Sequence, residues 1–71
     1  MNKEQQMLYS EMARNNCGMT LAEMLFWLDV FSNFLMSTEL ELDLINAMER
    51  DGHIFSEFNE GHNRTEWFVY E

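Results

Sequence analysis

The side chains best suited to chemistry in this 71-residue sequence are one cysteine, Cys17, and two histidines, His53 and His62. A thiol beside an imidazole can act as a nucleophile, and a cysteine with two histidines can bind zinc. Neither role has support from the spacing, because Cys17 has no local signature and the three positions match no zinc-ligand pattern. We therefore expect no catalytic residues and no metal site.

Acidic side chains alternate with leucine from Glu39 to Asp43, and clustered carboxylates are the ligands that Ca²⁺ prefers. This run is expected on a helix and lacks the loop spacing of an EF-hand. The sequence also has no glycine-rich phosphate loop and no His-Glu-x-x-His motif. We expect no cofactor, and the protein is predicted to be non-enzymatic.

Charge is the most informative property of the sequence. Thirteen Asp and Glu against four Lys and Arg give a formal net charge of −9. Residues 1–18 are neutral in sum, whereas residues 37–71 hold nine acids and only two arginines. Such a field repels phosphate backbones and anionic lipids and attracts basic surfaces. Solubility alone is the competing interpretation, since small soluble domains commonly carry net charge.

Length and composition predict a single domain over residues 1–71. One cysteine cannot close an intrachain disulfide. The apolar content of 46% is too high for a disordered segment, and no uncharged stretch approaches the ~20 residues that span a bilayer. No basic segment followed by an apolar run opens the sequence, which argues against a secretion signal. We expect a soluble, cytoplasmic protein.

Local patterns predict where the first two helices lie. The first is expected over about residues 3–15, stopped by a loop in which Gly18 is available for a left-handed C-terminal cap. The second starts at a capping box formed by Thr20 and Glu23. Its apolar stripe continues to Leu35, with a break expected near Ser32-Asn33, where both side chains compete for backbone hydrogen bonds.

A third helix is expected from Thr38 to a stop at Gly52, with Thr38 as the cap. The alternation over residues 40–44 is also compatible with a strand, but the cap, the glycine and the continuing apolar pattern favour a helix. Phe31 and Leu44 are expected to be buried. The predicted inner face of the third helix comprises Leu40, Leu44, Ala47 and Met48, with Leu42 and Ile45 beside it.

The C-terminal residues predict a β-hairpin. Residues 53–58 and 65–70 are rich in aromatic and β-branched side chains, and residues 59–63 hold the turn formers. The predicted fold class is therefore mainly α with a C-terminal β-hairpin, an α+β fold of three helices and a two-stranded wing.

The order of these elements resembles the winged helix-turn-helix family. Met19-Thr20-Leu21-Ala22-Glu23-Met24 is similar to the start of the family's second helix, and residues 44–54 look like the end of its recognition helix running into the wing. Arg64 with Trp67, Val69 and Tyr70 is similar to the wing's return strand. The resemblance covers about residues 5–71, although residues 24–37 are longer and more apolar than the family's compact second helix and turn.

The resemblance implies that the third helix and the wing would present cations to DNA. Here the exposed face of the third helix is expected to hold Glu39, Asp43, Asn46 and Arg50, and the wing holds mostly acids. Nonspecific DNA affinity comes from neutralised phosphates, so direct nucleic-acid binding is not expected. The residues expected to bind a partner are Glu39, Asp43, Asn46, Glu57, Glu60 and Glu66.

Two functions fit this pattern. The first is an acidic interaction module, an inhibitor or regulator that docks on the basic nucleic-acid-binding surface of another protein. Small acidic phage and mobile-element proteins of the anti-restriction and anti-CRISPR kind are similar in size and charge. The alternative is a dimeric winged-helix DNA-binding transcriptional regulator. In either case we expect a homodimer, because the second helix has more apolar surface than its neighbours would cover. The expected dimer contacts are Phe26, Trp27, Val30 and Phe34.

Overall fold

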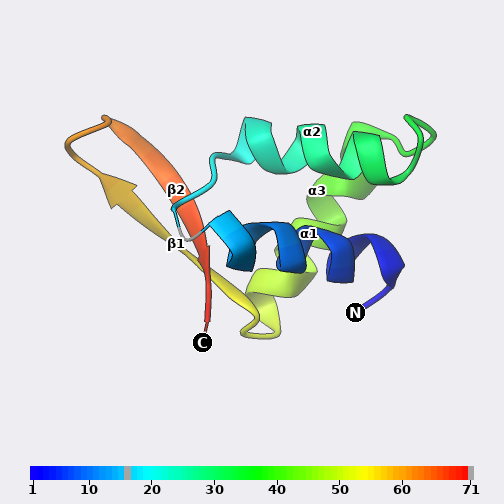
Figure 1. Ribbon diagram of the computed structural model, residues 1–71, viewed down its shortest axis with the longest axis horizontal. Coiled ribbons are helices and arrows are strands. Elements are labelled where there is room, and N and C mark those ends of the chain that lie inside the picture. The colour runs from blue at the N-terminus through cyan, green and yellow to red at the C-terminus, as the bar shows by residue number, and fades with distance from the viewer. Residues whose placement is uncertain (16, 71) are drawn as a thin grey trace.

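The computed structural model describes residues 1–15 and 17–70 and contains three helices followed by a β-hairpin. This arrangement confirms the predicted α+β fold class. In Figure 1, α1 and α2 lie side by side and run in opposite directions, α3 crosses behind them, and the hairpin projects from one end of the helical body. The elements are α1 (Lys3–Asn15), α2 (Leu21–Phe31), α3 (Thr38–Arg50), β1 (Ile54–Asn59) and β2 (Arg64–Val69).

Local hydrogen bonds set both ends of α2. The capping box is confirmed, because the Glu23 amide donates to Thr20 Oγ1 at 3.2 Å and the Thr20 amide donates to Glu23 Oε1 at 3.1 Å. The helix ends at Phe31, earlier than the apolar stripe to Leu35 suggests. The break expected near residues 32–33 is confirmed, since Asn33 has a φ of 56° and turns the chain out of the helix.

The N-cap of α3 lies one residue earlier than expected. Ser37, not Thr38, is the N-cap, and its hydroxyl accepts from the Leu40 amide at 3.2 Å. The predicted stop at Gly52 is confirmed. With a φ of 80°, Gly52 donates to the Glu49 carbonyl at 3.1 Å, and the His53 amide donates to the Met48 carbonyl at 2.9 Å. This bond pair is a Schellman motif, which favours glycine because of its positive φ.

The inner face of α3 differs from the expected one. The buried residues are Glu41, Ile45 and Met48, whereas Leu40 is exposed and Leu44 is only half-buried. The helix is rotated by about one position, so Leu40 lines a shallow surface hollow instead of the core. The apolar stripes on either side of this face are similar in strength, so packing against the other elements, not periodicity, selects the buried one.

The core is a methionine-rich cluster at the junction of all elements. Phe31, expected to be buried, packs against this cluster but stays partly exposed. Methionine suits such an irregular junction because its unbranched side chain adapts to the available space. The fully buried apolar residues are Leu8, Met12, Met19, Met24, Leu28, Ile45, Met48 and Ile54.

The hairpin is joined to the helical body through the loop between α1 and α2. Met19 and Trp67 form an isolated bridge, with the Met19 amide donating to the Trp67 carbonyl at 3.0 Å and the reverse bond at 2.8 Å. Gly18 does not have the left-handed conformation expected of it. Position 18 instead requires glycine because there is no room for a side chain. A Cβ there would lie 2.8 Å from Glu66 Cβ and 2.8 Å from Phe68 Cζ.

Candidate interaction surface

The outer face of α3 presents acids to solvent. Glu39, Asp43, Asn46 and Arg50 are all exposed and follow the 4-3-4 spacing of one helical face. The single cation on this face lies beside a carboxylate, since Arg50 Nε is 3.3 Å from Asp51 Oδ1. Asp51 thus partly offsets the charge of Arg50 on this face.

The hairpin continues this acidic character. Glu57 and Glu60 are exposed, as expected for residues that meet a partner. Arg64 is not a free cation of the hairpin, because its Nε and Nη2 both donate to Glu66 Oε2, at 3.1 and 3.0 Å. Both arginines of residues 37–71 thus lie against carboxylates of their own chain.

Glu66 is the one expected partner-binding residue that the fold removes from the surface. Its side chain is only 3% exposed, so its expected place in the interaction surface is corrected. Asn59 Nδ2 donates to its Oε1 at 2.7 Å, and the ring of His62 lies 3.3 Å from Oε2. The hydrogen bond from Asn59, followed by those from Arg64 and His62, lowers the pKa of Glu66.

The role of Glu66 is structural. In the strand register it pairs with Glu57, and like charges opposite each other destabilise a sheet. The hydrogen bonds that Glu66 accepts from Asn59 and Arg64 offset that repulsion and stabilise the hairpin turn. The local sequence gives only a weak signal for this, namely that Arg64 and Glu66 are two apart and so share one face of β2.

A second acid, Glu41, was not singled out by sequence reasoning as a buried group. It is 1% exposed, and its Oε2 has no hydrogen-bond partner among the described residues. Burial, together with the neighbouring Asp29 carboxyl on α2, raises the pKa of Glu41 to about 7. Two carboxyl groups that approach each other in this way favour sharing a proton over both being ionised.

The residues considered for catalysis and metal binding lie in three separate settings. Cys17 is exposed in the loop before α2. His53 precedes β1, with its ring edge-on to that of Tyr9 at 6.5 Å, and His62 belongs to the hairpin turn. Within the described part of the chain, no three potential metal ligands of these types gather.

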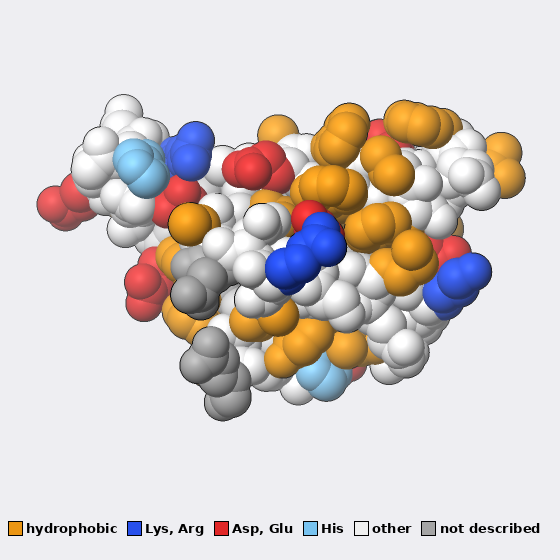
Figure 2. Space-filling model, in the orientation of Figure 1, with side chains coloured by type: hydrophobic (Ala, Val, Ile, Leu, Met, Phe, Trp, Pro, Cys, Tyr) orange, Lys and Arg blue, Asp and Glu red, His pale blue; other side chains and the backbone are white. Residues whose placement is uncertain are grey.

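An apolar face runs along α2 and the turn that follows it. Figure 2 shows hydrophobic side chains gathered over α1 and α2. Phe26 and Phe34 are exposed, whereas Trp27 and Val30 are half-buried. The Trp27 ring stacks on Phe31 with centroids 5.5 Å apart, so part of this surface is covered by its own aromatic contacts.

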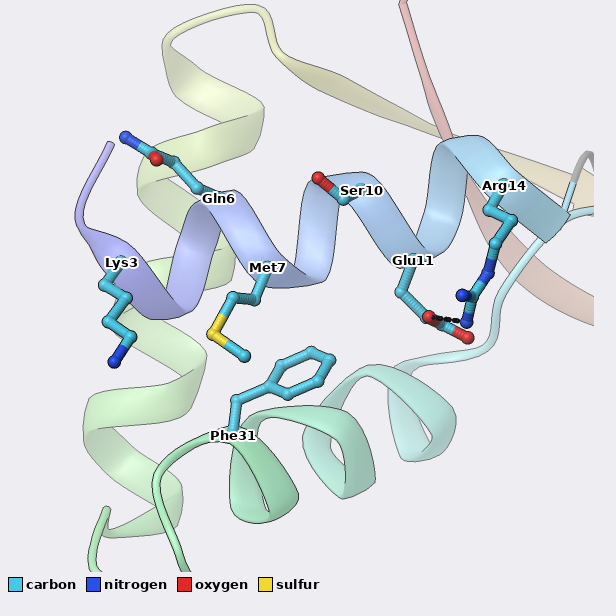
Figure 3. Close-up of a pocket in the computed structure, with 7 residues that line it drawn as sticks. All are labelled: Lys3, Gln6, Met7, Ser10, Glu11, Arg14 and Phe31. Atoms are coloured by element: carbon cyan, nitrogen blue, oxygen red, sulfur yellow. Dashed lines mark hydrogen bonds and ion pairs between the residues drawn. The ribbon is translucent and has the colours of Figure 1, made fainter.

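Beside this face, a groove of about 430 Å³ runs along α1 and is bounded on the α2 side by Phe31. Figure 3 shows Met7 of α1 and Phe31 of α2 pointing toward each other across it, with Lys3 and Arg14 toward its two ends. Arg14 is ion-paired with Glu11. The groove thus has an apolar middle and charged ends.

Comparisons with protein-family models, with curated proteins and with solved structures found no match to this chain. Among residues 1–15 and 17–70, no helix has both the length and the apolar character required to cross a bilayer.

Proposed function

We propose that this chain is a non-enzymatic, winged-helix-like interaction module that docks through an acidic surface on the basic, nucleic-acid-binding surface of another protein. We define this acidic surface as Glu39, Asp43, Asn46, Glu57 and Glu60. The single observation that carries the proposal is the exposure of the four carboxylates of this set on α3 and the hairpin, where winged-helix DNA readers present cations.

The winged-helix assignment rests on the order and packing of the elements. Three helices precede a hairpin, and α3 runs into β1 through the Gly52 turn. The bridge between Met19 and Trp67 ties the loop before α2 to the return strand of the hairpin. This contact fixes the hairpin against the helical body, an arrangement that is compatible with a wing.

The proposed mechanism is competition by charge. Residues 37–71 hold nine acids, and their two arginines already lie against carboxylates of the same chain. A negative field of this kind speeds encounter with a basic surface and opposes approach to phosphates. A partner whose nucleic-acid site is occupied by this surface would lose nucleic-acid binding, so the chain would act as an inhibitor that mimics DNA charge.

The experiment that tests the proposal is affinity capture from the source cell, followed by identification of the bound protein. We expect the wild type to capture a nucleic-acid-binding protein, and the combined variant Glu39→Lys, Asp43→Lys, Glu60→Lys to lose it. Glu4→Lys on α1, outside the acidic surface, is the control and should capture the partner normally. A triple variant that captures the same partner unchanged would contradict the proposal.

Single substitutions sharpen this test. Each exposed acid contributes about 1 kcal/mol or less, so Glu39→Lys alone should retain most of the binding. The neutral triple variant Glu39→Gln, Asp43→Asn, Glu60→Gln should lie between the wild type and the lysine triple. A graded loss with charge supports electrostatic docking, whereas complete loss from one substitution points to a specific short-range contact instead.

A further inference from the structure

The turn after α2 has an unusual backbone. Asn33 donates to the Val30 carbonyl at 3.2 Å and Phe34 donates to the Asp29 carbonyl at 2.7 Å, which are the two bonds of a Schellman motif. Asn33 takes the left-handed position, as that motif requires, but Phe34 also has a positive φ, of 61°. A bulky residue in this region is strained, at a cost of about 1–3 kcal/mol.

The backbone of this turn directs the apolar side chains of Phe34 and Leu35 into solvent. In a Schellman motif the residue at the position of Phe34 commonly packs back on its own helix. Here Phe34 is 70% exposed and Leu35 is 87% exposed. The fold of a single chain gains little from holding two large apolar groups in water on a strained turn. A contact with another molecule would account for both features.

A groove that can accept such a turn lies directly beside it. Phe31, three residues before Phe34, forms one wall of the groove between α1 and α2, and Met7 forms the other. Each chain therefore carries a projecting apolar turn and an apolar hollow side by side. A self-complementary pair of this kind is what a two-fold contact between identical chains uses, because each copy offers its turn to the other's hollow.

The distribution of charge selects a second copy as the occupant. Two chains of net charge −9 repel each other strongly if their acidic halves meet. The groove is instead close to neutral, because Glu11 lines it beside Lys3 and Arg14 and is ion-paired with Arg14, and residues 1–18 are neutral in sum. A strongly basic or strongly acidic partner surface gains no charge complementarity from this face, whereas a like chain can meet it while the two acidic halves stay apart.

We propose that two copies of this chain form a two-fold dimer in which the turn Phe34–Leu35 of each copy enters the groove between Met7 and Phe31 of the other. The dimer leaves the hairpin, with Glu57 and Glu60, out of the contact, because the hairpin projects from the opposite end of the molecule (Figure 1). This arrangement refines the dimer expected from sequence. The central contacts are now Phe34, Leu35 and Met7. Trp27 is not among them, because its ring is already stacked on Phe31 of its own chain. The proposal does not rest on the proposed docking to a basic partner.

Sedimentation equilibrium of the purified full chain, from about 1 µM to about 1 mM, tests this directly, since it covers the range of modest protein affinities. We expect a monomer–dimer equilibrium in the wild type. The double variant Phe34→Asn, Leu35→Ser should raise the dimer dissociation constant at least about 100-fold, as loss of a central apolar anchor does. Asparagine tolerates the positive φ of position 34, so this variant should stay folded.

Two matched variants make the outcome decisive. Phe58→Ser removes an exposed aromatic residue from the hairpin and should leave the dimer unchanged. Met7→Glu places a charge in the groove and should weaken the dimer as the turn variant does. Thermal melts at micromolar concentration verify that each variant is folded. A wild type that stays monomeric throughout would overturn the proposal, as would open-ended assembly or a dimer unaffected by the turn variant.

Discussion

The carboxyl group of Glu41 on α3 lies beside that of Asp29 on α2, inside the contact between the two helices. The Glu41 side chain is fully buried, and its Oε2 has no partner among the described residues. Ionising Glu41 therefore places a second negative charge next to Asp29 in a site that is almost closed to solvent. Burial first, and Asp29 second, raise the pKa of Glu41 to about 7.

This raised pKa gives stability a definite dependence on pH. An acid whose pKa is higher in the folded state binds more protons when folded, so the free energy of unfolding falls as pH rises from about 4.3 to about 7. We expect Glu41→Gln to increase stability at pH 8 by up to about 3 kcal/mol, because the amide remains neutral and can donate to Asp29. Thermal unfolding followed by circular dichroism between pH 5 and pH 8 measures the effect.

Glu39→Gln is the control for this prediction, since it changes an exposed acid on the same helix. It should leave the slope of stability against pH nearly unchanged. A wild-type melting temperature that rises from pH 5 to pH 8, or a Glu41→Gln variant that keeps the wild-type slope, would contradict the assignment of Glu41.

Glu66 has the opposite pH dependence. Its pKa is lowered by hydrogen bonds from Asn59, Arg64 and His62. The stability it provides is therefore present above about pH 4.3 and is lost as the pH falls through its lower folded-state pKa. We expect Glu66→Gln to destabilise the protein at neutral pH and to flatten the acid limb of its stability curve, measured by urea unfolding. Glu57→Gln, at the exposed opposite position, should change neither by a comparable amount.

The helix boundaries could be predicted because the chemistry that sets them is local. Thr20 and Glu23 cap α2 through bonds that span three residues, and Gly52 ends α3 through its own positive φ. The rotation of α3 could not be predicted in the same way. Leucines flank the buried stripe on both sides, and an acid at position 41 argues for the surface, yet packing against α1, α2 and β1 turns Glu41 inward.

The candidate surface was predictable only in part, for a similar reason. Glu39 and Asp43 lie on the polar face of an amphipathic helix, so their exposure follows from periodicity. The burial of Glu66 depends on Asn59 across the hairpin and on the close approach of Gly18 from a distant loop. The unusual backbone at Phe34 likewise has no marker in the sequence, because a phenylalanine there gives no signal for a positive φ.

The approach of Gly18 to the hairpin leads to a stability prediction. A Cβ at this position would lie 2.8 Å from both Glu66 Cβ and Phe68 Cζ, well inside van der Waals contact. We expect Gly18→Ala to lower the free energy of unfolding by about 1–3 kcal/mol, as overpacking does. Chemical denaturation measures this. Cys17→Ala, at the exposed neighbouring position, should change stability by less than about 0.5 kcal/mol. Equal stability of the two variants would show that the loop can move away from the hairpin.

Charge reversal on the acidic surface separates the two functions considered for this chain. If the chain acts as a DNA-binding regulator, the wild type should shift duplex DNA at physiological salt. We expect no shift, because Glu39 and Asp43 would meet phosphates and Arg64 is held by Glu66.

The combined variant Glu39→Lys, Asp43→Lys, Glu60→Lys should by contrast gain weak duplex binding in a gel shift at low salt. The change places three cations on the surface that winged-helix readers turn toward DNA. That binding should fade steeply as salt is added, because each phosphate contact releases a counterion and exposed charges are screened over about 8 Å at physiological ionic strength. The variant Glu4→Lys, with one charge reversed on α1, is the control and should remain inactive. Tight duplex binding by the wild type would instead favour the regulator, with its acids turned away from the DNA.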